Sequence, residues 1–303
     1  MNTAITISTS DSRILESTVR DYITLLKPGV MSLVVFTGLA GMLVAPGHIN
    51  AFQQCLTLFC IALASGAGAA MNMWYDRDID AIMKRTAKRP VPAGRIAPDD
   101  ALAFGLFLAA GAVMLMGLAL NWMAAAILAF AIFFYVVIYT MWLKRRTPQN
   151  IVIGGAAGAF PPMIGWAAVT GNVSLEAALL FAIIFLWTPP HFWALALYKN
   201  GDYAKANVPM MPVVAGPAST KRQMVAYTWI LALVTLLLPA LKMAGMIYAA
   251  AAAILAVVFL HHVYKVLYDQ TDTWPRRTFA FSIYYLFMLF TALMVDHWIH
   301  LWK

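Results

Sequence analysis

The chain has 303 residues, of which 62% are hydrophobic and 11% charged, whereas ordinary soluble domains carry about 25% charged residues. Its 21 Lys and Arg and 13 Asp and Glu give a formal net charge of +8. This composition excludes a soluble enzyme, a disordered regulator and a secreted disulfide scaffold, because too few polar residues are present to cover a surface exposed to water.

Apolar runs long enough to cross a bilayer follow one another along the chain, since a helix needs about 20 apolar residues to span the hydrocarbon core. Turn residues separate some of these runs, at Pro46-Gly47, Asn121, Gly171-Asn172 and Ala244-Gly245. We therefore expect an all-α, polytopic membrane protein with nine transmembrane helices in one bundle, with an N-terminal segment at 1–27 and a single membrane domain at 28–303. The expected spans are 28–45, 52–72, 101–120, 123–143, 151–170, 174–195, 225–241, 244–264 and 279–299.

The positive charges lie on alternate connections between these spans. All of the Lys and Arg except Lys242 and Lys303 fall on the N-terminal segment and on the connections after the second, fourth, sixth and eighth spans. The positive-inside rule then predicts a cytoplasmic N-terminus and a periplasmic C-terminus in a bacterial inner membrane. The two long connections, 73–100 and 196–224, lie on the same cytoplasmic side, where we expect the active site.

An acidic motif stands at the cytoplasmic end of the second span. Asn72, Asp76 and Asp80 are spaced four residues apart, so they share one helical face within two turns. The small residues Ser65 and Gly68 continue this face and would leave room for a ligand. Two carboxylates and an amide oxygen suit a hard cation such as Mg²⁺, completed by water and phosphate oxygens. The alternative is a set of helix-end carboxylates that only pair with neighbouring cations.

A basic segment follows the acidic motif directly. Six Lys and Arg lie between Arg77 and Arg95, among them Lys84, Arg85 and Arg89. Cations beside a metal site would stabilise a departing diphosphate, whose negative charge grows as its carbon–oxygen bond breaks. The alternative, a basic loop near anionic lipid head groups, explains the charge but not the acidic face beside it.

A second polar cluster follows Pro189 and Pro190, which should kink the sixth span. His191 and three later polar residues fall on one predicted helical face, again at the cytoplasmic end; they are Tyr198, Lys199 and Asp202. A histidine in a helix is often purely structural, so a structural role and a functional role both stay open for His191.

The motifs resemble those of a known family. Asn72-x3-Asp76-x3-Asp80 followed by Thr86-x-x-Arg89-Pro90 resembles the first motif of the UbiA-type intramembrane prenyltransferases. Nine spans with a second motif after the sixth match that superfamily over nearly the whole chain. The stretches 84–95, 188–197 and 202–213 resemble its heme-farnesylating branch.

The resemblance implies that the farnesyl group of farnesyl diphosphate joins a vinyl group of heme B, that water adds, and that diphosphate leaves. Asn72, Asp76 and Asp80 would hold Mg²⁺ and diphosphate. The cations of the basic segment would assist them, and Asp202 would stand in the second motif. That motif departs from the superfamily pattern, because Ala206 occupies the place of a second carboxylate. A second fully liganded Mg²⁺ is then not expected, and Tyr198 or Lys199 would contact phosphate directly.

His191 would ligate or orient the heme iron, deliver the water, or be structural; the sequence does not choose. The implied partners are heme B, farnesyl diphosphate, the lipid bilayer, and a downstream heme-modifying enzyme or terminal oxidase, without nucleic acid. Two other functions stay open. One is prenylation of an aromatic quinone precursor, and the other is a heme-binding or transport protein without chemistry.

Overall fold

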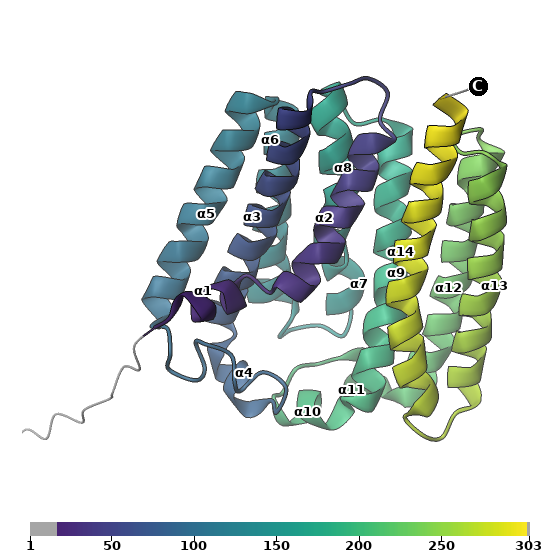
Figure 1. Cartoon of the computed structure of the whole chain (residues 1–303). Helices are drawn as coiled ribbons and strands as arrows, with labels where there is room; N and C mark the ends of the chain where they lie inside the picture. The colour runs from purple at the N-terminus through teal and green to yellow at the C-terminus, as the bar shows by residue number, and fades with distance from the viewer. Residues whose placement is uncertain (1–16, 302–303) are drawn as a thin grey trace, which may run out of the picture.

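The chain folds as a bundle of long helices that stand side by side (Figure 1). The computed structural model describes residues 17–301, and this part of the chain contains helices and no strand. The long helices are α2 (Pro28–Leu43), α3 (Ala51–Tyr75), α5 (Pro98–Ala119), α6 (Trp122–Phe133) with its continuation η1 (Phe134–Leu143), α8 (Ala156–Thr170), α9 (Leu175–Tyr198), α12 (Gly216–Ala240), α13 (Met246–Tyr268) and α14 (Thr273–Leu301). The short helices are α1 (Val19–Leu25), α4 (Arg77–Ile82), α7 (Asn150–Gly154), α10 (Asn200–Lys205) and α11 (Met211–Val214).

The predicted spans agree with the structure. Within residues 17–301, 8 helical segments are long and apolar enough to cross a membrane, and a ninth is reached when α1 and α2, bent by 52°, count together. The turn residues act as predicted: Asn121 caps α6 by accepting a hydrogen bond from the Ala124 amide (2.9 Å), and Gly171 ends α8 in the left-handed region (φ 68°). The all-α, multi-pass membrane fold is therefore confirmed.

The long helices form a closed ring. Each contacts the next along the chain, and α14 contacts α2, so the first and last spans are neighbours. Helix α2 also contacts α8, and α9 also contacts α14, so helices that are not consecutive in the ring pack against each other. The acidic motif on α3 and the polar cluster on α9 thus belong to the same bundle.

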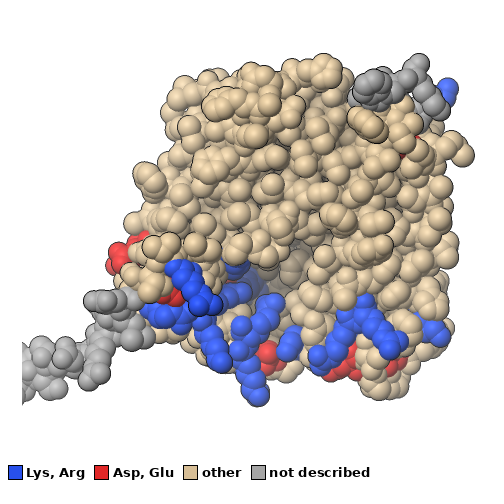
Figure 2. All heavy atoms as spheres, viewed as in Figure 1, with Lys and Arg blue, Asp and Glu red and all other residues tan. Residues whose placement is uncertain are grey.

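The charges gather at one end of the bundle. Figure 2 shows Lys and Arg, with some Asp and Glu, along the end that carries the short helices α4, α10 and α11 in Figure 1. At the opposite end, the Asp296 carboxylate accepts hydrogen bonds from backbone amides at the start of α13, including that of Ile247 (3.1 Å). The first 16 residues and Lys303 lie outside the described residues.

Helices α2 and α8 approach closely at two glycines. A Cβ on Gly41 would overlap the backbone of Pro162, and a Cβ on Gly165 would overlap the carbonyl oxygen of Gly38. Only glycine allows the two backbones to come this near.

Replacing Gly41 with alanine is expected to destabilise the protein by about 1–3 kcal/mol, the usual cost of overpacking. The measurement is the thermal-unfolding midpoint of the purified protein in detergent, which should fall. Gly158→Ala is the matched control, because a Cβ there meets nothing within 4 Å. Equal midpoints for the two variants would contradict the close approach of α2 and α8.

Candidate active site

The acidic motif lies where α3 ends and α4 begins. Asp76 caps the C-terminal end of α3, directly after Tyr75, and the chain turns there (φ −86°, ψ 7°) into the short α4. Asn72 donates a hydrogen bond from Nδ2 to the Asp76 carboxylate (2.7 Å), so these two side chains meet as the spacing predicts. Asp76 is fully buried, and Asp80 and Asn72 are 2% and 4% exposed. Charged carboxylates are rarely buried unless they are paired.

A separate cation contacts each of these three polar groups. Arg89 forms an ion pair with Asp80 (2.6 Å), and Lys144 forms one with Asp76. The Lys27 ammonium donates to the Asn72 side-chain oxygen (2.8 Å). The Lys27 backbone lies in the left-handed region (φ 51°), a strained conformation for a lysine that places it between α1 and α2. The buried acidic groups are therefore surrounded by positive charge from three separate parts of the chain.

Sequence reasoning identified Arg89 but missed Lys27 and Lys144. Their partners lie 45 and 68 residues away along the chain, so no local spacing could reveal the contacts. Arg145 was also missed; it pairs with the exposed carboxylate of Asp78 (2.6 Å) and reaches Asp76 at 3.5 Å. The hydrogen bond from Arg145 to Asp78 holds the pKa of the Asp78 carboxyl below its ordinary value.

A π-helix supplies the next wall of the site. In η1 the backbone hydrogen bonds are wider than in an α-helix, and the Lys144 amide bonds the Tyr139 carbonyl (2.9 Å). The rings of Tyr135 and Tyr139 stack at 5.8 Å, and the Thr140 hydroxyl accepts from Asn72 (3.2 Å). The space expected beside Gly68 is filled, because a Cβ there would meet the Tyr135 ring at 2.8 Å.

The basic residues of segment 84–95 have different partners in the structure. Arg89 contacts the acidic motif directly, whereas Lys84 and Arg85 are exposed and have no ion pair within residues 17–301. Arg95 binds Asp21 of α1 (2.6 Å) instead. The buried Thr86 hydroxyl, which sequence reasoning missed, donates to the Asp80 carbonyl (2.9 Å) and fixes the start of this segment against α4.

The predicted face running from His191 to Asp202 is wrong. Helix α9 continues through Pro189 and Pro190 but ends at Tyr198, and Lys199 turns the chain into the separate helix α10. Asp202 on α10 is half-buried, and no ion pair to it is recorded within residues 17–301.

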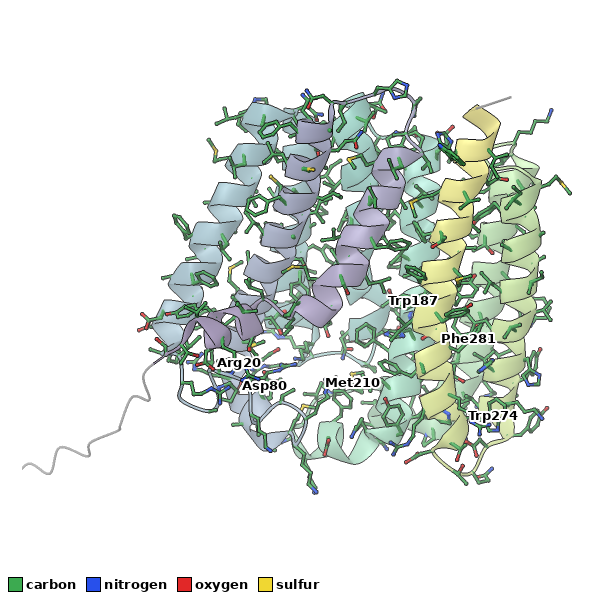
Figure 3. The ribbon with its side chains drawn as sticks, in the orientation of Figure 1. Arg20, Asp80, Trp187, Met210, Trp274 and Phe281 are labelled. Carbon is green, nitrogen blue, oxygen red and sulfur yellow. The ribbon has the colours of Figure 1, made fainter. Side chains whose placement is uncertain are left out.

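His191 itself is buried against two aromatic rings from α9 and α14. It stacks on Trp187 (4.2 Å, 16°) and on Phe279 (4.6 Å, 22°), and its Nδ1 lies 2.6 Å from the Ser282 hydroxyl. Tyr198 lies a few turns on, under the Arg276 guanidinium (4.7 Å from the ring). Figure 3 shows Trp187 farther than Asp80 from the basic end of the bundle.

Tyr203 lies on α10, the short helix that follows α9. It is buried, and burial raises the pKa of its phenol, while the charges of Arg85 and Arg89 oppose that rise and those of Asp202 and Asp80 add to it. Charges of the acidic motif and of the basic segment therefore both act on Tyr203.

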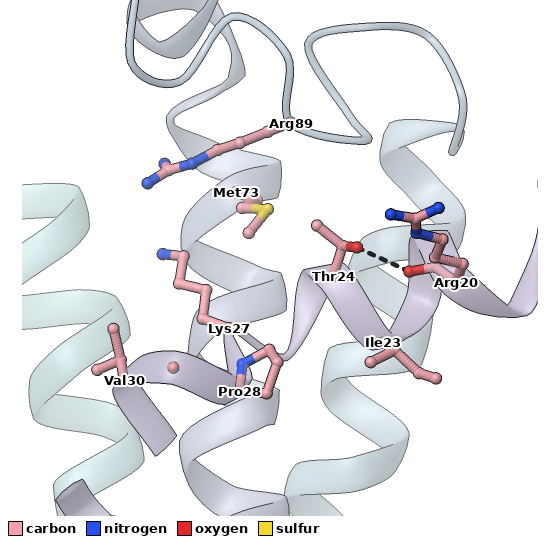
Figure 4. Close-up of a pocket in the computed structure, with 9 residues that line it drawn as sticks. Arg20, Ile23, Thr24, Lys27, Pro28, Val30, Met73 and Arg89 are labelled. Atoms are coloured by element: carbon pink, nitrogen blue, oxygen red, sulfur yellow. Dashed lines mark hydrogen bonds between the residues drawn. The ribbon is translucent and has the colours of Figure 1, made fainter. Parts of the chain in front are cut away.

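An open cavity of about 470 Å³ lies on the α1–α2 side of the acidic motif. Arg20, Lys27 and Arg89 line it together with Met73 and neighbouring residues of α1 and α2. In Figure 4 the charged ends of Lys27 and Arg89 point to the same side of α3. Buried carboxylates beside three cations at the end of a membrane bundle suit a phosphorylated ligand bound through a hard cation.

Comparisons with known proteins identify the family of this chain. The sequence matches the UbiA prenyltransferase family over residues 34–291. A Rhizobium rhizogenes protein named protoheme IX farnesyltransferase is 57% identical over 290 residues, which cover 94% of this chain and 91% of that protein. A protein of the same name from Sinorhizobium fredii is 59% identical over 295 residues, covering 96% and 93%.

Solved structures share the fold. A structure from a study of digeranylgeranylglyceryl phosphate synthase in membranes has a TM-score of 0.76 at 18% identity and covers 92% of this chain and 98% of that one. A UbiA homolog from Archaeoglobus fulgidus bound to GPP and Mg²⁺ has a TM-score of 0.65 at 16% identity and covers 90% and 99%. At these identities the likeness shows a common architecture.

Proposed function

This chain belongs to the UbiA prenyltransferase family, and on that basis we propose that it transfers the farnesyl group of farnesyl diphosphate to a vinyl group of protoheme IX (heme B), with addition of water, giving heme O and diphosphate. The observation that carries this proposal is the 57% and 59% identity, over nearly the whole length of both chains, to proteins named protoheme IX farnesyltransferase. The buried charges at the end of α3 supply a site for the diphosphate.

The residues of the acidic motif fit a magnesium ion. Asp76 and Asp80 offer two buried carboxylates, and the Asn72 amide borders Asp76 through its nitrogen while its oxygen accepts from Lys27. Water and diphosphate oxygens would complete the coordination, as is usual for Mg²⁺. When bound, the ion would neutralise the charge that grows on the departing diphosphate.

The cations of the site would bind the diphosphate oxygens that are not bound to the metal ion. Arg89, Lys27 and Lys144 already contact the acidic motif and are positioned for this role. Lys84 and Arg85 would reach in from the loop, and Tyr198 and Lys199 from the end of α9. Because the buried Ala206 offers no carboxylate beside Asp202, we propose one fully liganded metal ion rather than two.

The transfer step follows from this placement. As the carbon–oxygen bond breaks, both bonding electrons leave with diphosphate and the first carbon of the farnesyl group becomes an allylic cation. The terminal carbon of the vinyl group bonds to it, and the positive charge moves to the carbon next to the porphyrin. Water captures that carbon and loses a proton, which leaves a hydroxyl group. The aromatic cluster around His191 would hold the heme.

We also propose how the protein lies in the cell. Residues 28–303 would form one membrane domain in a bacterial inner membrane, with the basic end and segment 1–27 in the cytoplasm and the C-terminus in the periplasm. Heme O would stay in the bilayer through its farnesyl chain and pass to a heme-modifying enzyme or a terminal oxidase.

The proposal is tested by offering two acceptors to purified protein in lipid with farnesyl diphosphate and Mg²⁺. Heme B should cause diphosphate release, and 4-hydroxybenzoate should not. Release with 4-hydroxybenzoate alone would support prenylation of a quinone precursor instead. Heme binding without any diphosphate release would indicate a heme carrier.

A further inference from the structure

His191 is held in one orientation by its neighbours on α9 and α14. Trp187 and Phe279 cover the two faces of its ring, at 4.2 Å and 4.6 Å between ring centres. The Trp187 indole also donates a hydrogen bond to the Ser282 carbonyl (2.8 Å), which fixes α9 against α14 at this level. The imidazole can therefore present only its edge, which carries the two nitrogens.

Ser282 determines which of these nitrogens carries the proton. The buried Ser282 hydroxyl lies 2.7 Å from the Phe279 carbonyl oxygen and 2.6 Å from His191 Nδ1. A hydroxyl has one proton, and a carbonyl oxygen can only accept. Both hydrogen bonds exist together only if Ser282 donates to Phe279 and accepts from a protonated Nδ1. In the neutral ring, the other nitrogen, Nε2, then keeps its lone pair.

The surroundings of Nε2 differ from those of Nδ1. Within residues 17–301 Nε2 has no hydrogen-bond partner, and the His191 side chain as a whole is 7% exposed. Its lone pair is therefore available to a ligand at this level of the bundle. A lone pair in a fixed direction, bordered by flat aromatic rings, suits the iron of a planar tetrapyrrole.

We propose that Ser282 is a positioning residue, which holds His191 as the Nδ1–H tautomer so that Nε2 can ligate the iron of the heme substrate. The inference rests on the proposed function, because it takes heme B as the acceptor. Histidines that bind metals commonly donate their second N–H to an oxygen in this way, and loss of that oxygen typically costs 10–100-fold in affinity or activity.

The first experiment titrates heme B into the purified protein in lipid nanodiscs and records the Soret band and the affinity. Ser282→Ala should weaken heme affinity about 10–100-fold and give the Soret spectrum of His191→Ala. Ser282→Thr keeps the hydroxyl and should restore the original spectrum. Thr278→Val is the matched control on α14, since it removes a buried hydroxyl that has no hydrogen-bond partner, and should change neither quantity.

The outcomes separate this inference from the proposed function. If the unaltered protein binds heme B and Ser282→Ala keeps its affinity and spectrum, the role of Ser282 is overturned while the proposed function stands. If the unaltered protein binds no heme B, both are overturned. A second measurement does not depend on a variant of Ser282: in protein labelled with ¹⁵N-histidine, the ring nitrogens of His191 should report the Nδ1–H tautomer. An Nε2–H tautomer would contradict the proposal directly.

Discussion

Replacing Asp76 with asparagine is expected to lower the rate of farnesyl transfer by about a thousandfold or more, equivalent to about 4 kcal/mol of transition-state stabilisation. Asparagine keeps the size of the side chain but removes the charge that would hold Mg²⁺ beside the diphosphate. The Asp76 side chain is fully buried and contacts Asn72 and Lys144, so no group at the surface can take over the role of its carboxylate. The measurement is single-turnover formation of farnesylated heme by purified protein.

The matched control for Asp76 is Asp78→Asn. Asp78 lies two residues further on, but its side chain is 60% exposed and pairs with Arg145 at the surface. Its loss should change the rate by less than about threefold, since exposed ion pairs contribute little. Both variants should insert and elute as the unaltered protein does. Near-normal turnover by Asp76→Asn would exclude this carboxylate from the metal site.

Replacing Lys144 with methionine is expected to lower kcat/KM for farnesyl diphosphate about a hundredfold, in the range found when one donor to a developing anion is removed. Lys144 contacts Asp76 from the end of η1, and its side chain is only 16% exposed, so its charge acts in surroundings that water screens weakly. Methionine preserves the length of the side chain without the charge. The measurement is the initial rate of transfer over a range of farnesyl diphosphate concentrations.

Arg146→Met is the control for Lys144. Arg146 is an exposed cation in the same connection and has no ion pair within residues 17–301. Its loss should leave kcat/KM within about twofold, because an exposed charge is screened by water and salt. Equal effects of the two substitutions would show that the connection contributes only general positive charge.

The features predicted correctly from sequence depend on local patterns. The spans follow from apolar length, and their breaks from residues such as Asn121, which caps α6, and Gly171, which takes a left-handed conformation. The contact between Asn72 and Asp76 follows from a spacing of four on one helix. In each case the signal and the structure lie within a few residues of one another.

The features that were missed or wrong depend on tertiary contacts or on a helix end. Lys27 and Lys144 meet the acidic motif only after distant helices pack together. The π-helical hydrogen bonds of η1 could not be predicted from its largely apolar sequence. The break after Tyr198 was available in the sequence, because Asn200 and Gly201 are helix-ending residues, and it separates Asp202 from the face of His191.

The most direct test of the account is the mass of the porphyrin formed when the purified protein is incubated with heme B, farnesyl diphosphate and Mg²⁺. The account predicts a product heavier than heme B by one farnesyl group and one hydroxyl group, released together with diphosphate. Heme B recovered unchanged, from protein that binds both substrates, would contradict it.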